Sequence, residues 1–175
     1  MKATIYRGIE AIELVELPTP TQGEKDVLIK VMRAGICGTD LHAYLEEGAS
    51  VGIHPDNQFG HEFVGEVVEV GSKVNSLYWD PDPKNVAKIE VGSLVSGDSH
   101  VTCGKCYQCR LGEANVCMNE AILGITIDGI FAQYVKLPAK NLWAMDSSRI
   151  RPEVAAIMDP FGNAIHALSK VDVRG

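Results

Sequence analysis

Four of the five cysteines lie close together and could bind a metal ion. The segment reads Cys103-Gly-Lys-Cys106-Tyr-Gln-Cys109, and Cys117 follows after seven further residues. Four thiolates on a glycine-containing loop can complete a tetrahedral zinc site and leave no position for solvent. A ferredoxin-type iron–sulfur motif starts with the same spacing, but it continues C-x3-C-P, and no proline follows Cys117. We therefore predict a structural zinc site and keep unrelated buried cysteines as the ordinary alternative.

The fifth cysteine belongs to a second candidate site. Cys37 lies in the segment G-I-C-G-T-D-L-H of residues 35–42, and His61 and Glu62 follow some twenty residues later. Sulfur, nitrogen and oxygen donors of this kind form zinc sites that keep one position open for chemistry. Each residue alone has an ordinary interpretation, as a small buried side chain, a hydrogen-bonded histidine or a solvated glutamate. Only the three together predict a catalytic metal site.

The elements that must position these residues are mostly strands. Short β-branched segments between glycine, proline and aspartate turns predict strands at 3–6, 12–16, 27–33, 63–70, 93–96, 131–137 and 142–145. Many short strands favour a barrel or a sandwich, so we expect a mainly β fold. A short helix is expected over 39–46, and Asp159 as N-cap with Pro160 at the first helical position predicts a helix from Asp159 toward Leu168. Residues 75–90 are expected to form a surface loop.

Composition narrows the class of protein. The chain has 175 residues, 46% hydrophobic and 22% charged, as in one globular domain. Its net charge of −7, from 16 basic and 23 acidic residues, disfavours nucleic acid and anionic membranes as partners. No apolar segment approaches the ~20 residues that span a bilayer, and the N-terminus lacks a signal-peptide pattern. We therefore expect a cytoplasmic protein.

Longer motifs identify a family. The pattern G-H-E-x2-G-x5-G-x2-V over residues 60–74 resembles the zinc-containing alcohol dehydrogenase signature of the medium-chain dehydrogenase/reductase superfamily. Residues 35–42 and the four-cysteine segment are similar to two further segments of the same family, in the family's order. The resemblance therefore covers nearly all of the chain. Within the family, D-P-F-G-N-A-I-H at residues 159–166 is similar to the E-P-x-G-N-A-x-H segment of L-threonine 3-dehydrogenases.

The resemblance implies an architecture. Residues 1–150 would form a GroES-like catalytic domain, a partly open β-barrel with short helices and the four-cysteine zinc lobe. Residues 151–175 would form a connecting helix toward a nucleotide-binding domain for NAD or NADP. The chain contains no G-x-G-x-x-G segment, so we expect no cofactor-binding residues within it. We therefore expect a truncated enzyme whose residues 1–175 are inactive by themselves.

The resemblance also implies which residues bind the catalytic zinc. Cys37 and His61 would be ligands, and Glu62 a ligand that exchanges with water or substrate. Asp159 stands where relatives place Cys, Glu or Asp, and it would bind zinc either directly or through water. Asp40 would orient the histidine ligand.

Two more residues would move the proton. Thr39 would accept it from the substrate hydroxyl, and His42 would pass it toward solvent. Without the surrounding motif, the ordinary interpretations are a helix N-cap for Thr39 and a surface histidine for His42.

The activity that the resemblance implies is oxidation of a small secondary alcohol with zinc and NAD or NADP. The 3-hydroxyl of L-threonine is the expected target, and a sorbitol, butanediol or simple alcohol dehydrogenase is the alternative enzyme. A non-catalytic zinc-binding GroES-like interaction module is the alternative of a different class. We also expect a homo-oligomer, either a dimer or a tetramer.

Overall fold

The fold is mainly β, as the sequence predicts. The computed structural model describes residues 1–75 and 88–171, so most of the loop expected at 75–90 lies outside the described residues. Each expected strand is present. The bounds coincide with the prediction at 63–70 and 142–145 and differ by up to three residues elsewhere, and two short strands are added. The strands are β1 Lys2–Gly8, β2 Ala11–Glu16, β3 Asp26–Ala34, β4 Phe63–Val70, β5 Leu94–Gly97, β6 His100–Val101, β7 Ala121–Ile122, β8 Tyr134–Pro138 and β9 Leu142–Met145.

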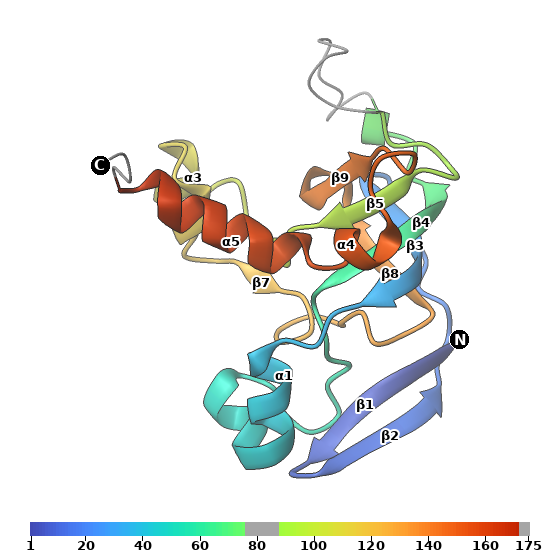
Figure 1. Cartoon of the computed structure of the whole chain (residues 1–175), viewed down its shortest axis with the longest axis vertical. Coiled ribbons are helices and arrows are strands. Elements are labelled where there is room, and N and C mark those ends of the chain that lie inside the picture. The colour runs from blue at the N-terminus through green and yellow to red at the C-terminus, as the bar shows by residue number, and fades with distance from the viewer. Residues whose placement is uncertain (76–87, 172–175) are drawn as a thin grey trace.

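The main sheet is open. Its five strands pair antiparallel in the order β8-β3-β4-β5-β9 (Figure 1). Within the described chain β8 and β9 are its two edges, so these strands do not close a barrel. The hairpin β1–β2 and the pair β6–β7 are separate two-stranded sheets.

One face of the main sheet covers the core. Val27 and Ile29 of β3 are fully buried, and the residue that follows them, Lys30, is exposed. Val67 of β4 and Val95 of β5 continue the same apolar cluster. Burial of each such side chain contributes roughly 1.5–3 kcal/mol of hydrophobic free energy, so this cluster fixes the pairing of β3 with β4.

The hairpin β1–β2 is tied to the rest of the chain through β1. The amide of Thr4 donates to the Phe131 carbonyl at 2.8 Å, and the amide of Tyr6 donates to the Asn57 carbonyl at 2.9 Å. The Tyr6 ring packs in a second apolar cluster with Ala43, Ile53 and Phe59. This cluster holds the helical segment after β3 against the hairpin.

The helices are short. The expected helix at 39–46 is α1 Gly38–His42, which continues as a π-helical turn at Ala43–Glu47 and a 3-10 turn at Gly48–Val51. The others are α3 Tyr107–Arg110, α4 Pro152–Ala155, α5 Met158–Ser169, and 3-10 turns at Ala114–Val116 and Ala139–Asn141. No helix within residues 1–75 and 88–171 is both long and apolar enough to cross a membrane.

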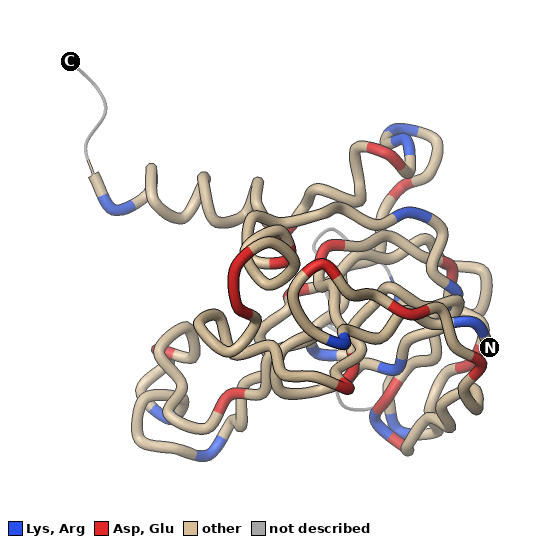
Figure 2. Tube along the Cα trace, turned by 90° about the horizontal axis from the view of Figure 1, so that it is seen from below, with Lys and Arg blue, Asp and Glu red and all other residues tan. Residues whose placement is uncertain are grey.

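The start of α5 differs from the prediction. The helix begins at Met158 with Ile157 as N-cap, so Asp159 is its second residue and makes no capping hydrogen bond. The physical reason is that the Asp159 carboxylate accepts hydrogen bonds from Ser99 and Asn163 instead. The helix extends away from the main sheet (Figure 1), and none of its residues is buried. Basic and acidic residues are interspersed along the chain (Figure 2).

Candidate metal sites

Cys37 lies where β3 leads into α1. It is the N-cap residue of this helix, and its amide donates to the Asp40 carboxylate at 2.9 Å. A carboxylate at the third helical position that accepts from the N-cap amide is half of a capping box and stabilises the start of the helix. The local sequence thus fixes the backbone that carries the Cys37 thiol.

His61 and Glu62 lie just before β4, on a segment held by backbone contacts. Ile130 donates to the Gly60 carbonyl at 3.0 Å, and Gly129 donates to the Gln58 carbonyl at 2.8 Å. Gly60 has φ +87°, and a Cβ there would lie 2.7 Å from the Phe131 ring. Only glycine tolerates both the positive φ and the close approach of the Phe131 ring, so Gly60 helps to position His61. The motif alone did not predict this role.

The sheet brings these two segments together. β3 and β4 are antiparallel with Ala34 opposite Phe63, so the residues after β3 meet the residues before β4. One donor atom from each of Cys37, His61 and Glu62 lies within 4.8 Å of the others. We call these three residues the three-donor site. A thiolate, an imidazole and a carboxylate suit zinc, and three protein ligands leave a fourth position free.

Asp40 lies next to the Nδ1 side of the His61 ring. Its Oδ1 lies 3.8 Å from His61 Nδ1, and neither buried atom has a hydrogen-bond partner in the described part of the chain. Burial raises the pKa of Asp40, although the Cys37 amide, the His61 charge and the Gly60 amide act in the opposite direction. Because Nδ1 faces this carboxylate, Nε2 is the ring nitrogen left for a metal. The donor set and this pairing both fit a zinc ion.

Thr39 lies beside the three-donor site, whereas His42 lies at the surface. Thr39 Oγ1 is 3.8 Å from Cys37 Sγ. His42 is one turn further along α1, with its side chain 58% exposed, and its Nδ1 is 3.2 Å from Glu46 Oε1. The sequence analysis did not single out Glu46, although its position four residues after a histidine on a helix indicates a contact.

Asp159 is not brought into the three-donor site. Its Oδ2 accepts a hydrogen bond from the Ser99 amide at 3.3 Å, and its Oδ1 accepts one from Asn163 Nδ2 at 3.0 Å. Both oxygens are thus engaged at the start of α5, and the donor group around Cys37 does not include them.

The four cysteines form a second, separate donor group. Their sulfur atoms all lie within 4.8 Å of one another, in Cys103, Cys106, Cys109 and Cys117. Backbone amides point at these sulfurs: Cys106 N–H donates to Cys103 Sγ at 3.3 Å, and Cys103 N–H donates to Cys117 Sγ at 3.3 Å. Amides directed at sulfur stabilise thiolates, so the donor set and its surroundings fit a structural zinc ion.

The thiols of this group differ in acidity. Amides of Lys105 and Cys106 lower the pKa of Cys103 to about 6. Burial, followed by hydrogen bonds with Cys106 and Cys117, raises the pKa of Cys109 to about 12. Repulsion between like charges opposes the ionisation of all the thiols in so small a group. The arrangement therefore calls for a cation if all four are to ionise.

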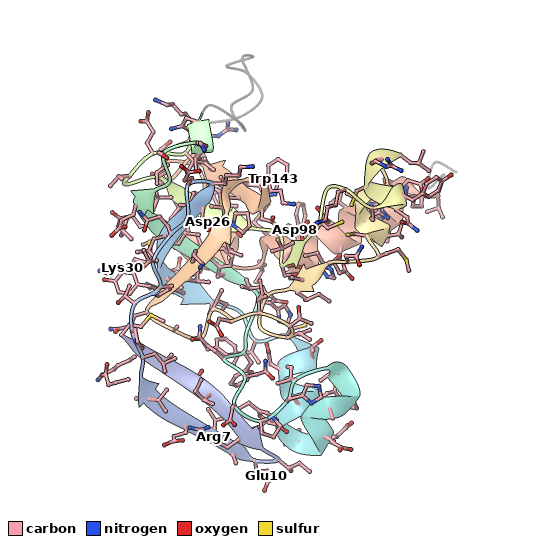
Figure 3. All side chains as sticks on the ribbon, turned by 180° about the vertical axis from the view of Figure 1, so that it is seen from behind. Arg7, Glu10, Asp26, Lys30, Asp98 and Trp143 are labelled. Carbon is pink, nitrogen blue, oxygen red and sulfur yellow. The ribbon has the colours of Figure 1, made fainter. Side chains whose placement is uncertain are left out.

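The cysteine lobe, residues 103–117, is joined to the main sheet by β6 and β7. The Asn141 side chain donates to the carbonyls of Asp98 and His100 at 3.0 and 2.9 Å, which fixes the start of this connection. In Figure 3, Asp98 lies between the main sheet and the lobe. The lobe is therefore a local unit built on the edge of the fold.

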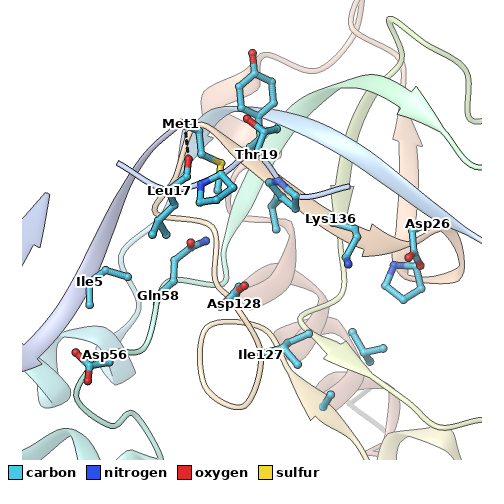
Figure 4. A pocket seen from close by; sticks show the side chains of 17 residues that line it. Met1, Ile5, Leu17, Thr19, Asp26, Asp56, Gln58, Ile127, Asp128 and Lys136 are labelled. Carbon is cyan, nitrogen blue, oxygen red and sulfur yellow. Dashed lines mark hydrogen bonds between the residues drawn. The ribbon is translucent and has the colours of Figure 1, made fainter. Parts of the chain in front are cut away.

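A cavity of about 870 Å³ lies elsewhere, between the N-terminal hairpin and β8. Met1, Ile5, Gln58, Asp128 and Lys136 are among its lining residues, and the Met1 amino group donates to the Leu17 carbonyl at 2.6 Å (Figure 4). None of the predicted site residues lines it. The predicted metal-binding residues therefore lie in the two donor groups and not in this cavity.

Comparison with known proteins agrees with these features. The L-threonine 3-dehydrogenase of Cutibacterium acnes is 44% identical over 168 residues, which cover 95% of this chain and 45% of that protein. The chain thus spans about 45% of the length of this curated relative.

Solved structures show the same fold. A Sinorhizobium meliloti protein designated a zinc-binding dehydrogenase, bound to NADP, has 32% identity and a TM-score of 0.82, over 99% of this chain and 46% of that one. A short chain alcohol dehydrogenase from Escherichia coli, complexed with NADH, has 32% identity and a TM-score of 0.78, over 97% and 45%. Residues 23–147 match the family described as alcohol dehydrogenase GroES-like domain. The chain belongs to this family, as its motifs predicted.

Proposed function

We propose that the protein is a zinc-dependent oxidoreductase that oxidises a secondary alcohol with hydride transfer to NAD or NADP. The observation that carries the proposal is the three-donor site. Cys37, His61 and Glu62 bring sulfur, nitrogen and oxygen donors within 4.8 Å, with His61 and Glu62 buried. A site with three protein donors keeps a position for substrate, unlike the closed group of four cysteines.

The chain's residues have distinct tasks in this reaction. Bound zinc supplies a Lewis acid that lowers the pKa of the substrate hydroxyl, and the nicotinamide supplies the hydride acceptor. Thr39, next to Cys37, would accept the hydroxyl proton and release its own hydroxyl proton toward His42. His42 would pass a proton to solvent from its exposed place on α1. Asp40 lies beside Nδ1 of the His61 ring, so Nε2 would be the nitrogen that binds the metal.

For Asp159 we propose an indirect role, through water. Its two oxygens already accept hydrogen bonds from Ser99 and Asn163. A direct bond to zinc would require one of these hydrogen bonds to break. The four cysteines would hold a separate structural zinc, the lobe zinc, whose binding energy stabilises the lobe.

L-threonine is the substrate we propose, on its 3-hydroxyl group. Identity to L-threonine 3-dehydrogenase at 44% supports this choice, and the alternative is a sorbitol, butanediol or simple alcohol dehydrogenase. The similar structures contain NADP in one case and NADH in another, so the assay must include both cofactors.

In this proposal residues 1–150 are the catalytic domain and 151–175 the connecting helix toward the cofactor domain. The exposed apolar side chains of α5, which include Phe161, Ile165 and Leu168, would pack on the cofactor domain, and we also propose that the protein is a homo-oligomer. We also propose a cytoplasmic location, and its support is that all five cysteines lie in groups that suit metal binding.

The experiment is an assay of the full-length protein combined with metal analysis. NAD and NADP are each tested with L-threonine, sorbitol, 2,3-butanediol and 2-propanol. We expect turnover of L-threonine and two zinc ions per chain. Turnover of one of the other alcohols, without turnover of L-threonine, would show that the proposed substrate is wrong. A single zinc held by the lobe, with no turnover, would favour the non-catalytic zinc module instead.

A further inference from the structure

We propose that Gly35 is a positioning residue whose lack of a side chain lets the Glu62 carboxylate reach the three-donor site. This inference rests on the proposed zinc site. It concerns neither a ligand nor the proton path, but the residue that leaves space for a ligand.

Gly35 and Glu62 face each other across two adjacent strands. Ala34 is paired with Phe63, and one step further the Gly35 amide donates to the Glu62 carbonyl at 2.8 Å. Directly opposed residues of antiparallel strands direct their side chains to the same face, with Cβ atoms only ~5 Å apart. The Glu62 side chain therefore shares its space with whatever side chain position 35 carries.

That space is already filled by the Glu62 side chain. A Cβ added to Gly35 would lie 2.2 Å from Glu62 Oε2, 3.0 Å from its Cβ and 3.3 Å from its Cδ. The first distance is far below any van der Waals contact. Gly35 is not among the glycines with positive φ, so its backbone is open to any residue. The requirement for glycine is therefore one of space and is specific to the Glu62 carboxylate.

An added methyl group would move the carboxylate and not the strand. The Glu62 backbone is held by the hydrogen bond to Gly35 and by the start of β4, whereas its side chain has rotatable bonds. Glu62 is only 7% exposed, so few other positions are open to its carboxylate. Displacement of Oε2 would leave Cys37 and His61 as a site of two donors, which binds zinc more weakly.

A matched control lies on the same loop. A Cβ added to Gly38 meets no atom within 4 Å, and Gly38 also lacks a positive φ. Gly38→Ala therefore makes the same chemical change three residues away without touching Glu62. Glu62→Ala supplies the second axis of a double-mutant cycle, because it removes the carboxylate, whose Oε2 is the closest atom at 2.2 Å, and keeps only the Cβ.

The experiment measures zinc stoichiometry and the affinity of the three-donor site for zinc, by chelator competition, in the full-length protein. We expect Gly35→Ala to weaken zinc binding at the three-donor site by about tenfold or more, the range seen when residues around metal ligands are changed. The lobe zinc should stay bound, and Gly38→Ala should keep both ions. In the Glu62→Ala background, Gly35→Ala should have little further effect.

Several results would overturn the inference. Unchanged affinity in Gly35→Ala would refute it and leave the proposed function standing. An equal loss with and without the Glu62 carboxylate would mean that Gly35 acts through the loop and not through Glu62. If Gly35→Ala fails to fold, the double variant Gly35→Ala/Glu62→Ala must recover folding, and its failure would also refute the inference. A wild-type protein with only the lobe zinc would refute both this inference and the proposed function.

Discussion

Asp40 Oδ1 lies 3.8 Å from His61 Nδ1, and both residues are buried. The other carboxylate oxygen, Oδ2, accepts the Cys37 amide at 2.9 Å. One side chain therefore fixes the backbone of one proposed ligand and lies beside the ring of another. A carboxylate oxygen can only accept, so a hydrogen bond between these two atoms would place the ring proton on Nδ1.

Asp40→Asn tests this arrangement. The amide oxygen can still accept from Cys37, but the amide nitrogen would then donate toward His61 Nδ1. The ring would carry its proton on Nε2, the nitrogen that should bind zinc. We expect the affinity of the three-donor site for zinc to fall by about tenfold or more. Asp128→Asn, at an exposed aspartate, is the control for loss of charge, and equal zinc affinity in both variants would contradict the assignment.

Thr39→Val removes the hydroxyl group beside Cys37 and keeps the shape of the side chain. We expect kcat to fall by about 10²-fold or more, as for other losses of a proton-transfer group, with the zinc content unchanged. Thr39→Ser retains a hydroxyl group and should keep most of the activity. The proton path would be wrong if the valine and serine variants turned over substrate at the same rate.

Cys109→Ser leaves three thiolates in the lobe. Binding energy of a closed structural site is folding energy, so we expect loss of the lobe zinc and a fall in Tm of about 5 °C or more. Cys37→Ser is the matched control in the three-donor site, and it should abolish turnover with a smaller change in Tm. A Cys109→Ser protein with normal Tm and no turnover would show that the lobe is not structural.

Graded chelation should remove the two zinc ions in order. The three-donor site leaves one coordination position of a tetrahedral ion without a protein ligand, whereas four sulfurs complete the coordination in the lobe. We expect turnover to disappear at a lower chelator concentration than the one that lowers Tm. Simultaneous loss of both ions would argue against the difference between an open and a closed site.

Residues 1–175 alone should not oxidise any alcohol. No G-x-G-x-x-G segment occurs in these residues, so the glycine turn and helix N-terminus that would hold a pyrophosphate are missing from them. The measurement is NADH or NADPH formation by purified residues 1–175 with L-threonine, beside the full-length protein as control. Turnover by the shorter chain would require a cofactor site among these residues.

The four-cysteine group was predictable because its donors are close in sequence. A loop from Cys103 to Cys117 can bring four sulfurs together with little long-range structure, so the spacing itself indicates the site. Strand positions were predictable for a similar reason, since alternation and turn residues act over a few positions. The start of α5 was not, because Ser99, distant in sequence, engages the Asp159 carboxylate that the local pattern assigned to a cap.

The three-donor site depends on tertiary structure as well as on sequence motifs. Residue types and motif spacing identified Cys37, His61 and Glu62, but only the antiparallel pairing of β3 with β4 brings their donor atoms within 4.8 Å. The same pairing places Gly35 opposite Glu62. Register and burial depend on the whole core, so contacts between residues on different strands cannot be read from either segment alone.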